Sequence, residues 1–142
     1  MTRASPTAVR HLRAHDRKPQ PWKNGGGTTS EIAAFPAGAS LDEFGWRVSI
    51  AEVASGGPFS TFPGVDRTLV VLDGEGIDLD VEGRPTSTLG PASAPYRFPA
   101  DAPTVATLRS GPIRDLNVMT RRGRFDHGVT RLAPDSSRFR LS

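Results

Sequence analysis

The chain has 142 residues, a length that suits one domain with one core, and it contains no cysteine. Disulfide frameworks, thiolate metal sites and cysteine nucleophiles are therefore excluded. The net charge of +3 is unevenly distributed, because residues 1–18 and 121–142 each carry +4 and residues 19–120 carry −5. A nucleic-acid-binding domain places its basic surface on the folded part of the chain, so we expect no nucleic acid as a partner.

Neither a signal peptide nor a membrane span is expected. The longest aliphatic run, residues 69–72, has only four residues, whereas a transmembrane helix needs about 20. We expect a cytoplasmic protein with no membrane partner. The charge distribution predicts a basic N-terminal segment at 1–18, a folded β domain at 19–125 and a polar, arginine-rich tail at 126–142.

The predicted elements are short strands separated by glycine and proline. In chain order we expect strands at residues 31–35, 46–51, 68–72, 77–82, 96–98, 105–108 and 113–119. Asp73–Gly76 reads Asp-Gly-Glu-Gly, which is typical of a hairpin turn between the strands on either side. No window shows helical periodicity. This pattern predicts an all-β sandwich or barrel.

A glycine-rich stretch precedes the first confident strand. Trp22, Lys23 and Asn24 come directly before the three glycines at 25–27. Such a loop is either flexible and exposed or one whose backbone approaches a ligand closely. It is not a phosphate-binding loop, because the lysine precedes the glycines instead of following them.

Three predicted strands each carry polar residues on one face. Alternation places Arg47 beside Ser49, and Asp115 beside Asn117, with apolar residues behind each pair. If these faces point inward, they jointly line a cavity suited to a small polar or anionic metabolite. The alternatives are solvent-facing strands, or a structural hydrogen-bond network inside the protein. The candidate inner-face residues are Thr29, Glu31, Arg47, Ser49, Asp115, Asn117 and Met119.

The remaining catalytic signals are weak. His11, His15 and His127 are expected on the surface, since no spacing brings several metal ligands together. No G-x-S-x-G elbow supports a serine nucleophile. We therefore expect neither a metal nor another cofactor.

Four ordered motifs carry a family resemblance over about residues 7–125. They are Pro21–Gly27 with Thr29-x-Glu31-Ile32, then Trp46-Arg47-x-Ser49-x-Ala51, then Gly57–Arg67, and finally Asp115-x-Asn117-Val118-Met119-x-Arg121. Together they resemble the HutD/Ves family of cupin-like proteins. The resemblance implies an RmlC-type cupin β-barrel or sandwich and an accessory or regulatory role in histidine utilisation, with a small metabolite as ligand.

Two departures from the family pattern qualify these expectations. Metal-dependent cupins carry two histidines and a glutamate after the Pro-Gly turn, whereas residues 65–69 contain none, which predicts a metal-free protein. Family members also continue through further strands, so we expect a shortened member or a fragment. An open sheet edge would then favour a homodimer or lower stability.

Within this reading each candidate residue has an expected role. These are an apolar wall from Trp22, anion contacts from Lys23 and Arg47, orienting hydrogen bonds from Asn24, Thr29 and Asn117, and acceptors from Glu31 and Asp115. We favour a binding protein. The alternatives are a metal-independent hydrolase or isomerase acting on a small carboxylate, with Glu31 or Asp115 as general base, and a structural protein without a ligand.

Overall fold

The computed structural model describes residues 19–23, 25–132 and 136–141. All regular elements in these residues are strands, as predicted. They are β1 (Pro19–Pro21), β2 (Gly27–Phe35), β3 (Trp46–Val53), β4 (Gly57–Pro58), β5 (Val65–Asp73), β6 (Ile77–Val81), β7 (Ser87–Leu89), β8 (Tyr96–Pro99), β9 (Thr104–Leu108), β10 (Ile113–Arg121), β11 (His127–Leu132) and β12 (Ser136–Leu141). The basic N-terminal segment with His11 and His15 lies outside the described residues, as does Asn24.

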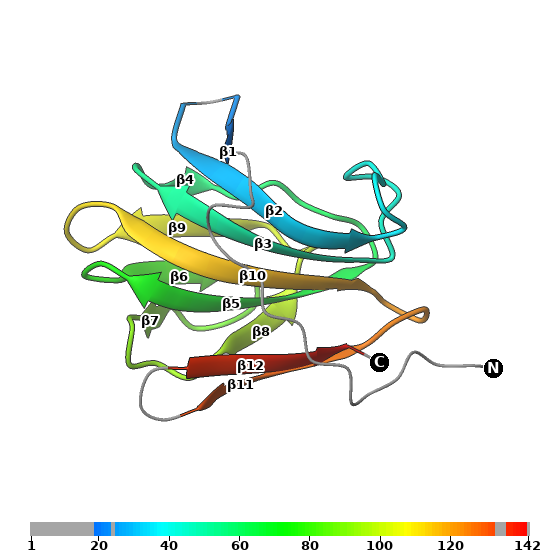
Figure 1. The fold of residues 1–142 in the computed structure, drawn as a ribbon. Helices are drawn as coiled ribbons and strands as arrows, with labels where there is room; N and C mark the ends of the chain where they lie inside the picture. The colour runs from blue at the N-terminus through cyan, green and yellow to red at the C-terminus, as the bar shows by residue number, and fades with distance from the viewer. Residues whose placement is uncertain (1–18, 24, 133–135, 142) are drawn as a thin grey trace.

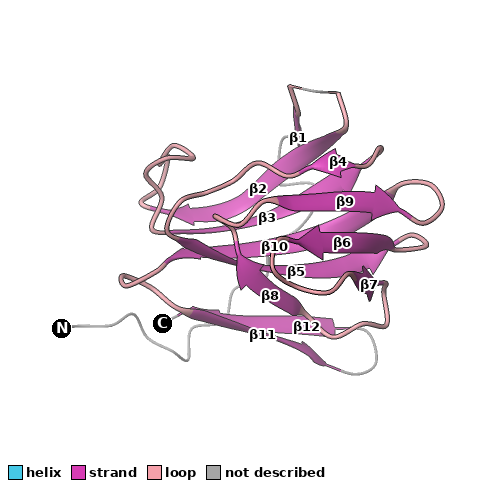
Figure 2. Ribbon diagram, turned by 180° about the vertical axis from the view of Figure 1, so that it is seen from behind, coloured by secondary structure: helices cyan, strands magenta, loops and turns pink. Residues whose placement is uncertain are grey.

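Two antiparallel sheets face each other, and a separate hairpin lies beside them (Figure 1). The larger sheet has the strand order β1-β2-β3-β10-β5-β8, and the smaller has the order β4-β9-β6-β7. Figure 2 shows the smaller sheet in front of the larger one, with the β11–β12 hairpin along the β8 side. In the described part of the chain, no helix is long and apolar enough to cross a bilayer.

Alternate residues of each strand build the core between the sheets. On β5, Leu69 and Val71 point inward, and on β6 Leu79 meets them from the opposite sheet. The residues between the inward ones on β6, Asp78 and Asp80, are more exposed. This alternation gives β6 one buried face and one more exposed face.

The predicted hairpin at Asp73–Gly76 is wrong. β5 pairs with β10 and β8, while β6 pairs with β9 and β7. The turn therefore carries the chain from one sheet to the other. Gly74 and Gly76 do have positive φ angles, of 103° and 106°, which glycine adopts most readily. The local sequence thus specified a turn but not the strand that pairs after it.

The C-terminal segment forms a hairpin where the sequence predicts a polar tail. On β11, Val129 packs against the apolar outer face of the larger sheet. Arg131 donates hydrogen bonds to the carbonyl oxygens of Val71 and Ser93. Val129 and Arg131 alternate along β11 with His127, and all three point towards the larger sheet. Each of these inward-facing residues therefore has a partner on that sheet.

His127 is buried, which corrects its predicted surface position. Its side chain lies between two threonine hydroxyls, with Thr68 Oγ1 2.7 Å from Nε2 and Thr120 Oγ1 2.7 Å from Nδ1. Both threonines lie on the outer face of the larger sheet, on β5 and β10. Only 5% of His127 is exposed, and the side chain ties β11 to the sheet.

Candidate functional site

The strand register brings the predicted polar faces together on the inner face of the larger sheet. Asn117 on β10 lies opposite Ser49 on β3, which lies opposite Glu31 on β2. In the next row, Met119 lies between Arg47 on β3 and Arg67 on β5. We call Arg47, Met119 and Arg67 the arginine row.

The inward orientation follows from the neighbours of these residues along each strand. Ala51 and Val53, two and four positions beyond Ser49, belong to the core between the sheets, as does Ile113 before Asp115. Because strand side chains alternate, the polar residues at the same parity face the same interior. The three polar pairs therefore face one interior, while their role as the lining of a ligand cavity stays a prediction.

The glycine-rich stretch is a close-packed turn. The indole Nε1 of Trp22 donates a hydrogen bond to Thr29 Oγ1 at 2.7 Å, and its ring packs against the core. A Cβ at Gly27 would lie 2.3 Å from the Glu52 carbonyl oxygen and 3.2 Å from the Trp22 ring. Only glycine therefore fits between this strand and the indole. The turn holds Trp22 and Thr29 beside the inner polar face.

Arg47 and Glu31 form the outer part of the site. Arg47 Nε lies 3.0 Å from Glu31 Oε1, and the two side chains are 14% and 43% exposed. The bulge in β2 directly after Glu31 changes the register with β3. This pair therefore lies where the interior opens towards solvent.

Arg67, Asn117 and Asp115 form the inner part. Arg67 Nε donates to Asn117 Oδ1 at 2.8 Å, and Asn117 Nδ2 donates to Asp115 Oδ1 at 2.9 Å. Asp115 and Asn117 are only 1% and 2% exposed. The Arg67 guanidinium also lies over the Phe59 ring, 4.6 Å from its centroid.

Sequence reasoning did not select Arg67 as a site residue. The aliphatic run it identified begins at Thr68, one residue later. The available signal was period-two alternation, because Arg67 shares its face with Leu69 and Val71 on β5. An arginine at that parity must enter the interior and needs partners there.

Burial perturbs the charged groups of the inner part in opposite directions. Desolvation raises the pKa of Asp115 to about 6, although Arg67 and the hydrogen bond from Asn117 oppose the rise. Desolvation lowers the pKa of Arg67 to about 10, with Asp115 opposing and the like charge of Arg47 adding to the decrease. Arg67 stays a cation at neutral pH, while Asp115 titrates just below it.

The other predicted residues contribute differently. Lys23 is exposed, and in the described residues no contact joins it to the inner polar face. Ser49 is buried beside Asn117, and Met119 packs with Phe44 in a small apolar cluster. The site thus combines most of the predicted residues with Arg67 in place of Lys23.

Two hollows lie in the described part of the protein, and neither is lined by Arg47, Arg67 or Asn117. One of about 10 Å³ is lined by Trp22, Val53, Phe59 and Ala106 among others, which is room for about one water molecule. A cleft of about 350 Å³ lies between the loops at 41–42 and 60–63, with Arg121 beside it. Arg121 joins these loops by hydrogen bonds to the carbonyl oxygens of Phe44, Pro63 and Asp42.

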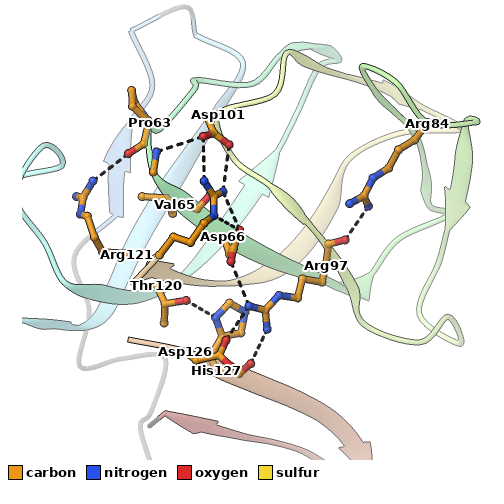
Figure 3. Close-up of polar contacts among 12 residues, drawn as sticks. Pro63, Val65, Asp66, Arg84, Arg97, Asp101, Thr120, Arg121, Asp126 and His127 are labelled. Atoms are coloured by element: carbon orange, nitrogen blue, oxygen red, sulfur yellow. Dashed lines mark hydrogen bonds and ion pairs between the residues drawn. The ribbon is translucent and has the colours of Figure 1, made fainter. Parts of the chain in front are cut away.

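A second polar cluster lies outside the interior, and its arginines are all paired with carboxylates (Figure 3). Arg122 contacts Asp66 at 2.8 Å and Asp101 at 3.2 Å, and Arg97 contacts Asp66 at 3.2 Å and Asp126 at 2.7 Å. Although burial opposes it, the two guanidinium groups lower the pKa of Asp66. Every cation in this cluster has a carboxylate partner, so its role is to join β5, β8 and the hairpin.

The described residues contain no group of three or more His, Cys, Asp or Glu side chains placed to hold a metal ion. The groups that could hold a ligand are instead guanidinium, amide and carboxyl groups.

Comparison with known proteins gives a consistent picture. The HutD family model matches residues 14–142. An uncharacterized 21.2 kDa protein in the hutC 3' region of Pseudomonas putida is 45% identical over 108 residues, which are 76% of this chain and 56% of that protein. Protein Ves of Citrobacter koseri is 43% identical over 104 residues, which are 72% and 53%. The chain spans about half the length of these curated relatives.

Solved structures agree with the sequence comparison. A conserved protein of unknown function from Pseudomonas aeruginosa PAO1 is similar with a TM-score of 0.79 at 41% identity, over 85% of this chain and 61% of that chain. HutD from Pseudomonas fluorescens SBW25 gives 0.76 at 39% identity, over 84% and 64%. A Cupin_2 domain of a transcriptional regulator from Enterobacter cloacae gives 0.50 at 22% identity, over 67% and 96%. The last likeness concerns the fold alone, and it confirms the predicted cupin-like architecture.

Proposed function

The chain belongs to the HutD family, which also contains Ves proteins, and we propose that it binds a small metabolite through a carboxylate group on the inner face of the larger sheet. The arginine row carries this proposal. Arg47 and Arg67 face one interior, and each directs only its Nε to a described residue. Their terminal nitrogens make no hydrogen bond within the described part of the chain.

A guanidinium group with free terminal nitrogens is suited to a carboxylate. Its parallel N–H groups match the two oxygens, and burial strengthens the interaction relative to water. Asn117, the Asp115 carboxyl group and the Thr29 hydroxyl supply further donors and acceptors within the same interior. Trp22 and Phe59 give apolar walls on the side of the small cavity. Such a set suits a small metabolite that carries one carboxylate and other polar groups.

The test is ligand-induced thermal stabilisation against a panel of carboxylate intermediates of histidine breakdown. Arg67→Lys keeps the charge but loses the paired N–H groups, and Asn117→Ala removes the amide. Arg84→Lys is a matched control, because Arg84 follows the turn after β6 and donates hydrogen bonds to the Tyr96 hydroxyl and the Arg97 carbonyl oxygen, not to the inner polar face. We expect stabilisation of wild type and Arg84→Lys, and at least about a tenfold weaker affinity in Arg67→Lys. Equal stabilisation of all variants would exclude the inner face as the binding site.

An accessory or regulatory role in histidine utilisation is the second part of the proposal. Its support is the family itself and a curated relative named for its position beside hutC. The expected result is that deletion of the gene alters growth on histidine as sole nitrogen source, and that wild type restores growth but Arg67→Lys does not. Unaltered growth, or full restoration by Arg67→Lys, would contradict this role for the site.

One observation favours a second candidate, a metal-independent hydrolase or isomerase. Asp115 is buried beside a cation and has its pKa raised to about 6, which suits a general base near neutral pH. Incubation of the same panel with the protein distinguishes the two functions. Product formation that Asp115→Asn abolishes supports the enzyme, and recovery of the unchanged ligand supports the binding protein.

A further inference from the structure

We propose that the site takes up one proton when it binds a carboxylate, and that Asp115 is the group that becomes protonated. This inference rests on the proposed function and adds its regulation by pH. It follows from the way the charges of the site are arranged, in two steps.

The first step is that Asp115 senses Arg67 through an intervening amide. Asn117 accepts from Arg67 Nε at 2.8 Å and donates to Asp115 Oδ1 at 2.9 Å. No ion pair joins Asp115 directly to an arginine among the described residues. The charge of Arg67 and the hydrogen bond from Asn117 favour the ionised carboxylate, and no direct contact between Asp115 and the guanidinium has to break when a ligand binds. A ligand on the terminal nitrogens of Arg67 leaves this chain of hydrogen bonds intact.

The second step concerns the balance of charge. Arg67 on β5 is the charged group that acts on Asp115, Arg47 on β3 and Glu31 on β2 lie further along the same face, and the opposite sheet contributes apolar side chains such as Leu79 and Ala106. The free site has two cations and two carboxylates. A bound carboxylate adds a third negative charge to an interior that solvent screens poorly.

Asp115 is the group that relieves this excess. Glu31 is 43% exposed and paired with Arg47, so water screens its charge, whereas Asp115 is 1% exposed. Burial already raises the pKa of Asp115 to about 6, and the attraction of Arg67 opposes the rise more than the hydrogen bond from Asn117 does. A ligand that neutralises Arg67 removes this opposition, so the pKa of Asp115 increases through the neutral range.

The consequence is a pH-dependent affinity. With one proton taken up per ligand, the dissociation constant rises by up to about tenfold per pH unit between the free and the bound pKa of Asp115. A site of this kind binds its ligand more tightly as the surroundings become more acidic. Asp115→Asn mimics the protonated state and removes the linkage.

The experiment uses formate as the probe, because it offers a carboxylate alone and stays ionised over the range tested. Its dissociation constant is measured by NMR of the arginine Nε–H signals from about pH 6.5 to about pH 8.5. For wild type and the control Asp73→Asn, a 71% exposed carboxylate paired with Arg114, we expect a rise of more than about tenfold. For Asp115→Asn we expect tight binding with less than about a twofold change.

Two further readouts keep the test decisive. Calorimetry in buffers of different ionisation enthalpy gives the protons taken up, and the carboxyl ¹³C signal of Asp115 reports its protonation in the wild-type protein. Formate binding without proton uptake, or an unchanged Asp115 signal, overturns this inference and leaves the proposed function standing. Absence of formate binding at every pH overturns both.

Discussion

Substitution of His127 by glutamine tests how the C-terminal hairpin is held to the sheet. His127 is 5% exposed, between two hydroxyls at 2.7 Å. Burial and the charge of Arg97 lower its pKa to about 4, with Asp126 and Asp66 opposing, from an ordinary value of 6.5. The folded protein therefore binds fewer protons here than the unfolded chain between these two values.

The sign of the pH effect follows directly. Stability from this group is fully present above about pH 6.5 and is lost as the pH falls towards about 4. The difference of about 2.5 units corresponds to about 3 kcal/mol of the free energy of unfolding. Glutamine stays neutral throughout and replaces the two hydroxyl contacts imperfectly, which costs about 1–3 kcal/mol at neutral pH.

Urea unfolding of wild type and His127→Gln at several pH values measures both quantities. At neutral pH we expect the variant to be less stable. Towards about pH 4.5 the difference should shrink by about 2 kcal/mol, because the imidazole of unfolded wild type gains a proton that the folded protein does not bind, whereas glutamine gains none in either state. Comparing the two proteins cancels the titration of the other carboxylates. A stability difference that stays constant with pH would refute the reasoning.

Three further predictions concern other parts of the structure. The free energy of unfolding of Asp115→Asn should increase by up to about 3 kcal/mol relative to that of wild type as the pH rises from about 4 to above 6. The reason is that the raised pKa of Asp115 makes wild type lose stability over that interval. A difference between the two proteins that does not change with pH would contradict this. Gly27→Ala should lower stability by about 1–3 kcal/mol through its clash with the Glu52 carbonyl, while Gly90→Ala, which meets nothing within 4 Å, should change it by less than about 0.5 kcal/mol; equal melting temperatures would count against the close approach. Arg121→Lys should speed amide exchange in the loops at 41–45 and 60–64, since the compact ammonium of lysine lacks the planar spread of donors with which the guanidinium reaches three separate carbonyls. Unchanged exchange rates would show that the loops hold together without it.

The sequence predicted the inner polar face because that face depends on local alternation. Arg47 with Ser49 and Asp115 with Asn117 share parity with apolar core residues on the same strands, and the register then aligned them. Arg67 was not predicted as a site residue because the expected strand began at the aliphatic run, one residue after it. Its spacing of two residues from Leu69 nevertheless indicates that both side chains lie on the same face.

The errors lie where structure depends on distant partners. Asp73–Gly76 specifies a turn, but the strand that pairs after it is chosen by apolar packing across the two sheets. His127 is in an arginine-rich segment whose composition favours solvent. Its burial depends on hydroxyls of Thr68 and Thr120, 59 and 7 residues away, which no local pattern can indicate.

Comparison of the two arginine clusters helps to distinguish a structural network from a binding site. In the outer cluster, Arg122 directs three nitrogens at Asp66 and Asp101, and Arg97 is similarly paired. In a purely structural network inside the protein, each arginine would be expected to pair with carboxylates at least as fully, since an unpaired buried cation is more costly than an exposed one. Arg67 instead has one hydrogen bond to an amide and a second cation, Arg47, in the same row. Among the described residues Arg67, unlike Arg47 with its Glu31 partner, therefore contacts no carboxylate and has terminal nitrogens without a hydrogen bond, which is the arrangement expected where a ligand carboxylate binds them.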